Sequence, residues 1–152
     1  MDTLQGVITR GALPHELTNG AGGTSPTIDR QGPELEELTN ALVSLHKELF
    51  GRGPTKARSG YSGPDTVVAT LENGLTTAER NLIAVGEQRF VCESRMALLR
   101  AHEPFFVETV ERITGRTVRA FMSGTDVQAD VSTAVFCFEP GPGAEAPKGG
   151  GL

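Results

Sequence analysis

The chain has 152 residues, enough for one domain with a modest core. Its formal net charge of −5 disfavours a general nucleic-acid binder, because such proteins carry a basic excess. The longest apolar run, 134–138, is too short to cross a bilayer, and the N-terminus lacks the pattern of a secretory signal. We therefore expect a soluble, cytoplasmic protein without direct membrane insertion.

Glycine and proline dominate both ends of the chain. Segments 1–33 and 140–152 bury too little apolar surface to offset the entropy of ordering, so we expect disordered tails. The folded domain is then 34–139. Cys92 and Cys137 fall in regular elements without metal-ligand spacing, and we expect reduced, largely buried thiols.

The first predicted element is a helix over 33–50. Pro33 suits the first turn of a helix, and Gly51 followed by Gly53 and Pro54 ends it. An apolar stripe along this helix can pack on the chain's own sheet or form a seam between subunits. The stripe consists of Leu35, Leu38, Leu42, Leu45 and Leu49.

A β-hairpin follows the first helix. Segments 55–61 and 66–72 have strand patterns, and the intervening "SGPD" is typical of a turn. Alternation places Lys56 and Arg58 on one face of the first strand and Ala57, Ser59 and Tyr61 on the other.

A helical region occupies 76–114. Thr76 and Glu79 form a capping box, which predicts a short helix to about residue 85. A longer helical pattern begins near residue 87, and Pro104 predicts a kink or short break at 102–103. Gly115 ends this pattern.

The last elements form a second hairpin. Strands are expected over 117–123 and 131–139, with a polar loop over 124–130. Alternation in the first of these strands separates Val118, Ala120 and Met122 from Arg119 and Phe121.

The two halves of the domain share one plan of helix, Gly-Arg, strand, polar turn and apolar strand. This predicts an α+β, two-layer fold with a four-stranded, mostly antiparallel sheet, helices on one face, and the order α-β-β-α-α-β-β. The uncovered face should carry Lys56, Arg58 and Arg119 beside exposed apolar groups. A sheet of this kind commonly finds a partner, so we expect a homodimer.

The basic residues of the two halves allow two interpretations. Segment 50–60 is no phosphate-binding loop, because it leads from a helix to a strand and lacks the GxxxxGK[ST] pattern. Arg52 and Arg116 can hydrogen-bond the last carbonyls of the preceding helices. Alternatively, five residues converge on an anionic ligand or acidic partner: Arg52, Lys56, Arg58, Arg116 and Arg119.

No catalytic, metal or cofactor site is visible in the sequence. Asp126 and Asp130 lie in the loop between the last two strands and are expected to form a turn. His46 on the polar flank of the first helix and His102 before the kink are expected to face solvent. No nucleophile has a neighbouring base, so we expect no enzyme.

Four segments carry a family resemblance: "GRGPTKAR", "LTTAER", "ERITGRTVRAFMSGTD" and "VFCFEP". In this order they resemble the C component of a sodium-translocating membrane-potential-generating system, the MpsC-like family. The resemblance covers about residues 34–139. It places the family pattern on Gly51, Gly53, Pro54, Thr76, Glu79, Gly115, Arg116 and Asp126.

The resemblance implies an accessory or regulatory subunit beside membrane proteins that transport cations or inorganic carbon. It brings no catalytic residues. Such a subunit would dock through its basic strand and open sheet face, peripheral to the membrane. The alternative is a small-molecule or anion sensor, or an enzyme, with a site between sheet and helices built on Arg116 and Asp126.

Overall fold

The computed structural model describes residues 25–142, within which the chain forms four helices and four strands. The predicted tails lie mainly outside this range. The helices are α3 (Ser25–Phe50), α4 (Thr77–Ala84), α5 (Gln88–Ala101) and α6 (Glu103–Thr114). The strands are β1 (Lys56–Tyr61), β2 (Thr66–Glu72), β3 (Val118–Asp126) and β4 (Val131–Phe138).

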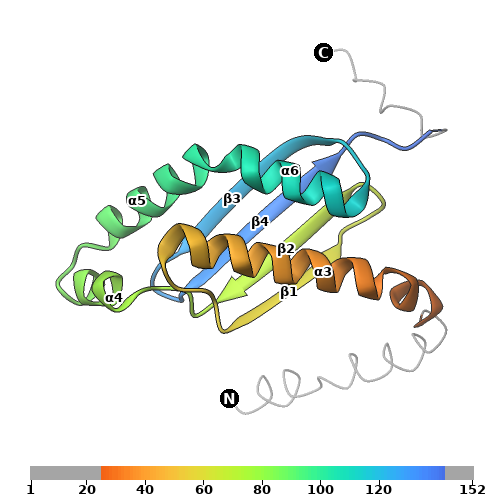
Figure 1. The fold of residues 1–152 in the computed structure, drawn as a ribbon. Coiled ribbons are helices and arrows are strands. Elements are labelled where there is room, and N and C mark those ends of the chain that lie inside the picture. The colour runs from red at the N-terminus through yellow and green to blue at the C-terminus, as the bar shows by residue number, and fades with distance from the viewer. Residues whose placement is uncertain (1–24, 143–152) are drawn as a thin grey trace, which may run out of the picture. The chain divides into compact units, whose positions relative to one another are not determined.

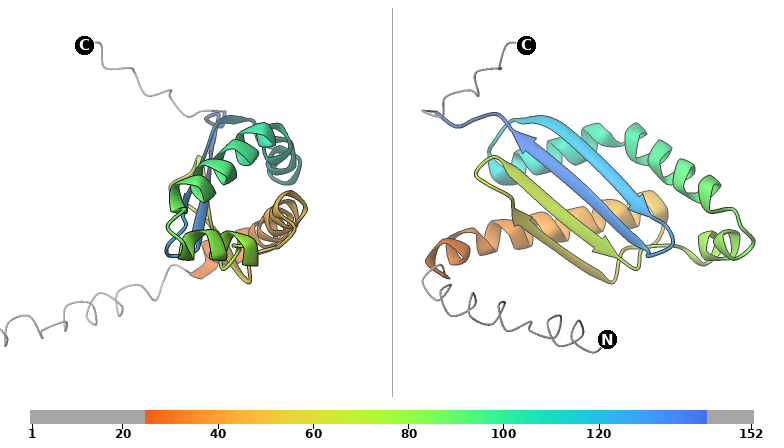
Figure 2. Two further views of the ribbon diagram at one scale, coloured as in Figure 1. Left: turned by 90° about the vertical axis from the view of Figure 1, so that its left-hand side faces the viewer. Right: turned by 180° about the vertical axis from the view of Figure 1, so that it is seen from behind.

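The strands form one antiparallel sheet in the order β1-β2-β4-β3. From Glu34 on, α3 lies on the same face of the sheet as α5 and α6, and no helix within residues 34–142 covers the other face (Figures 1 and 2). The predicted two-layer α+β fold is confirmed. The order α-β-β-α-α-α-β-β has one helix more than predicted, because the break at His102 separates α5 from α6 completely.

The two α-β-β units meet at the centre of the sheet. Strands β2 and β4 pair along their whole length, with Ala69 opposite Ala134. Strands β1 and β3 therefore form the two edges. In Figure 1, α3 lies over the β1–β2 side and α6 over the β3–β4 side, so each hairpin is covered by the helix that precedes it.

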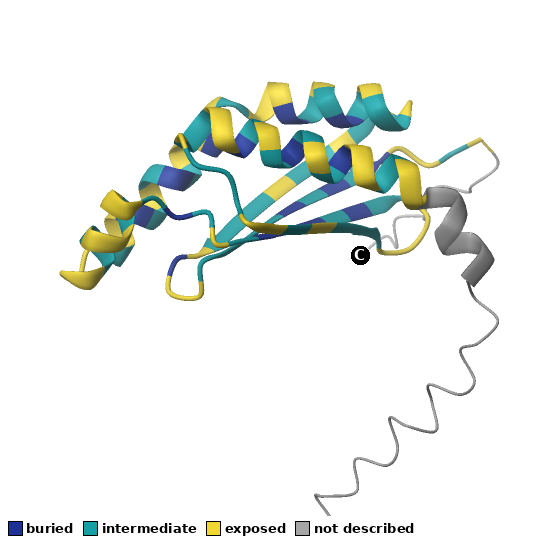
Figure 3. Cartoon of the chain, turned by 60° about the horizontal axis from the view of Figure 1, so that its bottom comes forward, coloured by how far each residue is buried: buried dark blue, intermediate teal, exposed yellow. Residues whose placement is uncertain are grey.

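The core lies between the sheet and the helices, whose buried residues turn toward the strands (Figure 3). Phe106 of α6 stacks on Phe121 of β3, which stacks on Phe136 of β4, with ring centroids 5.9 and 4.8 Å apart. A smaller apolar cluster lies near α4 and α5. It contains Leu75, Val91 and Val127.

Most predicted boundaries agree with the structure. The two strands of the first hairpin, the break before α6 and the capping box of Thr76 and Glu79 are confirmed. Gly51 and Gly115 end α3 and α6 with positive φ angles of 78° and 66°, which glycine adopts without steric cost.

Two boundaries differ from the prediction. Helix α3 begins at Ser25, so Pro33 lies inside it rather than in its first turn. Strand β3 continues to Asp126, because 124–126 still pair with β4. The predicted polar loop therefore shrinks to 127–130. Polar and glycine residues suggested a loop there, but the cross-strand hydrogen bonds outweigh their low strand propensity.

The predicted faces of β3 are wrong because of a β-bulge. Val118 pairs with Phe138 and Ala120 with Cys137, which leaves Arg119 as an extra residue. The bulge shifts the alternation by one residue. Val118 and Phe121 consequently both pack on the core, whereas Met122 is 54% exposed.

Candidate functional site

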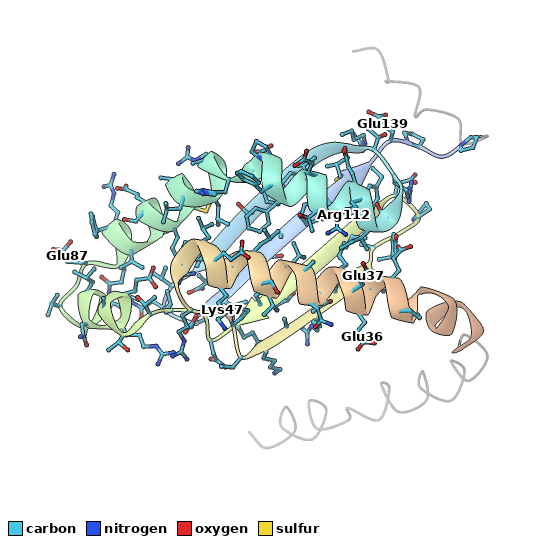
Figure 4. The ribbon with its side chains drawn as sticks, in the orientation of Figure 1. Glu36, Glu37, Lys47, Glu87, Arg112 and Glu139 are labelled. Atoms are coloured by element: carbon cyan, nitrogen blue, oxygen red, sulfur yellow. The ribbon has the colours of Figure 1, made fainter. Side chains whose placement is uncertain are left out.

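A cleft of about 230 Å³ opens between α3 and the junction of α5 with α6. Most of its lining is apolar, and Phe106, 1% exposed, lies at its base. Figure 4 shows Glu36, Glu87 and Glu139 at the periphery of the domain, so these acids lie outside the cleft. The lining residues are Leu45, Glu48, Leu49, His102, Phe105 and Phe106.

The local sequence explains why the cleft is open. Leu45 and Leu49 are one turn apart on α3 and face the gap between the helices. Pro104 at the start of α6 interrupts the helical hydrogen bonding, so the chain turns at His102. Phe105 is left 57% exposed at the rim, although an aromatic ring gains free energy when it leaves water.

His46 lies beneath the cleft and is only 5% exposed, so the prediction that it faces solvent is wrong. Its ring stands edge-on to Phe106, with centroids 5.4 Å apart, and its Nδ1 lies 2.8 Å from the Leu42 carbonyl oxygen. Burial, aided by the positive charge of Arg95, lowers the pKa of His46 below its usual value. The imidazole is therefore neutral at pH 7.

A buried ion pair joins the first turn of α4 to the middle of α5. Arg95, 3% exposed, donates from Nε and Nη2 to the two carboxylate oxygens of Glu79 at 2.8 and 2.7 Å. Nη2 also donates to the Gly74 carbonyl at 2.9 Å, and the guanidinium lies 4.1 Å from the ring centroid of Phe50. These contacts give Arg95 a structural role in the fold.

Glu79 serves both the ion pair and the helix cap. Burial alone would raise the pKa of Glu79, but hydrogen bonds from Arg95 and from the backbone N–H of Thr76 hold it below the usual value. Sequence reasoning missed this pair. The signal was present, because Arg95 interrupts an apolar series at Val91 and Leu99 with four-residue spacing.

Arg116 does not cap its preceding helix as expected. Its guanidinium donates to the Pro64 carbonyl at 2.7 Å, the Glu139 carbonyl at 3.2 Å and the Asp65 carboxylate, and it lies over the Phe138 ring. Arg119 donates to the Phe138 carbonyl at 3.2 Å. Arg116 therefore ties the second hairpin to the turn of the first, whereas Arg119 bonds within the second hairpin.

The other three predicted basic residues lie elsewhere on the domain. Lys56 starts β1 and pairs with Glu72 at 3.5 Å, and Arg58 is exposed in the middle of the same strand. Arg52 lies between α3 and β1, and its buried Nε has no hydrogen-bond partner among the described residues. The register places Lys56 at the end of the sheet opposite Val118, so the five residues do not gather at one point.

The family model for the Na⁺-translocating membrane potential-generating system (MpsC) matches residues 31–140. The chain belongs to the MpsC family. A Bacillus subtilis (strain 168) protein described as uncharacterized protein YrhF is 24% identical over 108 residues, which cover 70% of this chain and 88% of that protein. No solved structure matches the chain.

Several residues of the MpsC pattern have local roles in the fold. Besides the helix ends at Gly51 and Gly115, Asp126 Oδ1 accepts hydrogen bonds from the backbone N–H groups of Gln128 and Ala129 at 3.0 and 2.9 Å. The predicted turn role of Asp126 is thus confirmed. Asp126 is the last residue of β3 and Arg116 precedes that strand, so the length of the strand, roughly 26 Å at about 3.3 Å per residue step, lies between them.

The remaining features concern metal ions and membranes. Over residues 25–142, no three His, Cys, Asp or Glu side chains gather as a metal site. No helix in that range is long and apolar enough to cross a bilayer.

Proposed function

We propose that this MpsC-family chain is an accessory subunit without catalysis of its own, which binds a membrane-spanning component of a sodium-dependent membrane-potential system. The description of the MpsC family names the sodium-translocating membrane-potential system in which we place the chain. The cleft between α3 and α6 supplies the binding surface, and its exposed aromatic rim at Phe105 is the observation that carries the proposal.

The cleft suits an apolar side chain presented by a partner helix or loop. Its volume of about 230 Å³ exceeds that of one leucine or phenylalanine side chain, and Leu45, Leu49 and Phe106 offer contacts on two sides. Partner helices commonly insert apolar anchors into grooves of this kind.

Charge favours a basic partner segment. The chain carries a net charge of −5, and Glu48 lies at the cleft itself. Cytoplasmic loops of membrane proteins carry an excess of Lys and Arg. A loop with an apolar anchor and flanking basic residues would complement both features, so we propose that this chain acts at the cytoplasmic side of the membrane.

The test is capture from detergent-solubilised membranes of the organism that encodes the chain. The bait is the tagged chain, and co-purified proteins are identified by mass spectrometry. We expect a membrane-spanning cation carrier in stoichiometric amount. Phe105→Glu should abolish its capture, because a carboxylate in the rim would have to be desolvated on binding.

Phe90→Glu is the matched control, since Phe90 is also 57% exposed but does not line the cleft. It should retain the carrier. Capture of no membrane-spanning protein, or equal capture by both variants, would refute the proposal. A deletion strain should also show a lower membrane potential that the wild-type chain and Phe90→Glu restore and Phe105→Glu does not.

A further inference from the structure

The right-hand view of Figure 2 shows the sheet from its helix-free side, and the strand register arranges the residues of this face in rows across the strands. Paired residues of neighbouring strands share a face, so the register defines each row. One row runs Gly60, Val68, Val135, Met122 from edge to edge. The next runs Arg58, Thr70, Thr133, Gly124, and the last Lys56, Glu72, Val131, Asp126.

A hollow lies at one edge of this face. It measures about 280 Å³, and its floor includes Gly60 between Arg58, Val68 and Thr70. A Cβ atom added at Gly60 would meet nothing within 4 Å, and its φ is not positive. The chain's own backbone therefore does not require glycine there, and glycine inside a strand often marks the close approach of another chain.

A protrusion lies at the other edge of the same row. Met122 on β3 is 54% exposed and extends from the sheet at the level of Gly60. Methionine is flexible and polarizable, which suits it to fill a hollow of irregular shape. The two features are separated by the width of the sheet, so one copy of the chain cannot bring them together.

We propose that two copies pack face to face through this surface, related by a two-fold axis that runs parallel to the strands between β2 and β4. This rotation places β1 of one copy over β3 of the other. It causes no shift along the strands, so each row faces the same row of the second copy. Met122 of each copy then enters the Gly60 hollow of the other. The contact is made twice, as two-fold symmetry requires.

The other rows are complementary under the same rotation. Arg58 of one copy lies over Gly124 of the other, where the missing side chain leaves room for the guanidinium stem. Lys56, whose side chain is 66% exposed, faces the carboxylate of Asp126. In the centre, Val68 lies over Val135. No row brings two like charges together.

The area sets the expected strength of the dimer. Four strands spaced about 4.8 Å apart and about 25 Å long make a face of roughly 480 Å². Two copies remove roughly 1,000 Å² from water, which is near the lower limit for a specific interface. The dimer should therefore dissociate measurably on dilution.

Thiol cross-linking tests the arrangement directly. In a background with Cys92→Ser and Cys137→Ser, the double variant Gly60→Cys/Met122→Cys should form a covalent dimer with a short bismaleimide cross-linker, because facing sheets lie about 10 Å apart, too far for a direct disulfide. Each single variant should stay monomeric on a non-reducing gel, because like positions lie on opposite edges of the interface. Equal cross-linking by a single variant, or none by the double variant, would refute the arrangement.

Sedimentation of the full chain supplies the second measurement. Gly60→Phe fills the hollow and should raise the dissociation constant at least tenfold without changing the circular dichroism spectrum, because its side chain enters open space in the monomer. Phe105→Glu should leave the dissociation constant unchanged, which separates this interface from the helix-side cleft. A wild-type chain that remains monomeric at millimolar concentration would overturn the proposal.

Discussion

Arg95 and Glu79 form a bidentate ion pair in which the guanidinium is almost completely buried, with N–O distances of 2.8 and 2.7 Å. Glu79→Ala should lower the free energy of unfolding by about 3–5 kcal/mol, because it leaves a buried charge unpaired. Urea denaturation measures this. Glu79→Gln keeps an amide oxygen that can still accept from the Thr76 N–H or from Arg95, so it should lose less stability than Glu79→Ala.

The exposed pair of Arg89 and Glu93 is the control for this prediction. Its N–O distance is also 2.7 Å, but both side chains are mostly in solvent. Glu93→Ala should leave the free energy of unfolding almost unchanged, because water screens an exposed ion pair. Equal losses at Glu79 and Glu93 would show that burial of the Arg95 pair does not matter.

His46 should make stability depend on pH below neutrality. Burial lowers its pKa in the folded state, so the unfolded chain binds the proton more strongly. The stabilisation is fully present above the unfolded pKa of about 6.5 and is lost as the pH falls toward the folded pKa. The slope contributed by this one group cannot exceed about 1.4 kcal/mol per pH unit.

Denaturation curves between pH 5 and 7 test this dependence. His46→Gln should flatten it. If His46→Gln and wild type lose stability in parallel over this range, His46 is not the responsible group.

Tyr61 is the single tyrosine of the chain, so its ionisation can be followed by ultraviolet absorbance. Burial and the hydrogen bond of its hydroxyl to Glu34 Oε1 at 2.7 Å raise its pKa to about 12. The associated stability is present below the unfolded pKa of about 10 and is lost as the pH rises toward 12. Glu34→Gln should lower the observed pKa, and an unchanged titration would contradict the assignment of the hydrogen bond.

Asp130 ties the two hairpins together at the end of the sheet near α4. Its Oδ1 accepts from the backbone N–H groups of Gly74 and Leu75 at 2.9 and 3.1 Å, and its φ is 54°. Asp130→Ala should cost about 2 kcal/mol, since it removes two hydrogen bonds and places alanine in the left-handed region. Asp130→Asn retains an acceptor and tolerates that conformation, so urea denaturation should show less than half the loss.

Local sequence signals predicted the parts of the fold whose causes are local. The capping box at Thr76 and Glu79, the left-handed glycine at Gly115 and the hairpin strands each depend on a few neighbouring residues. The bulge at Arg119 left no such signal, because it depends on how β3 pairs with a distant part of β4. One unpaired residue was enough to reverse the predicted faces of Phe121 and Met122.

The candidate site was harder to predict than the fold. Leu45 and Leu49 belong to an apolar stripe, and such a stripe predicts burial in the core. They line an open cleft because of the direction that α6 takes after Pro104. The burial of His46 and Arg95 likewise depends on helices that approach from other parts of the chain. Spacing within one helix cannot reveal which flank a second helix will cover.

The strand order also has a kinetic consequence. Each hairpin is closed by a short turn, 62–65 or 127–130, and hairpins of this kind form within about 1–10 μs. The β2–β4 ladder instead joins residues as far apart as Thr66 and Cys137, and their encounter carries the loop-closure entropy of all three intervening helices. We expect the docking of two preformed hairpins to limit the folding rate, so substitutions at Ala69 or Ala134 should slow folding more than they speed unfolding.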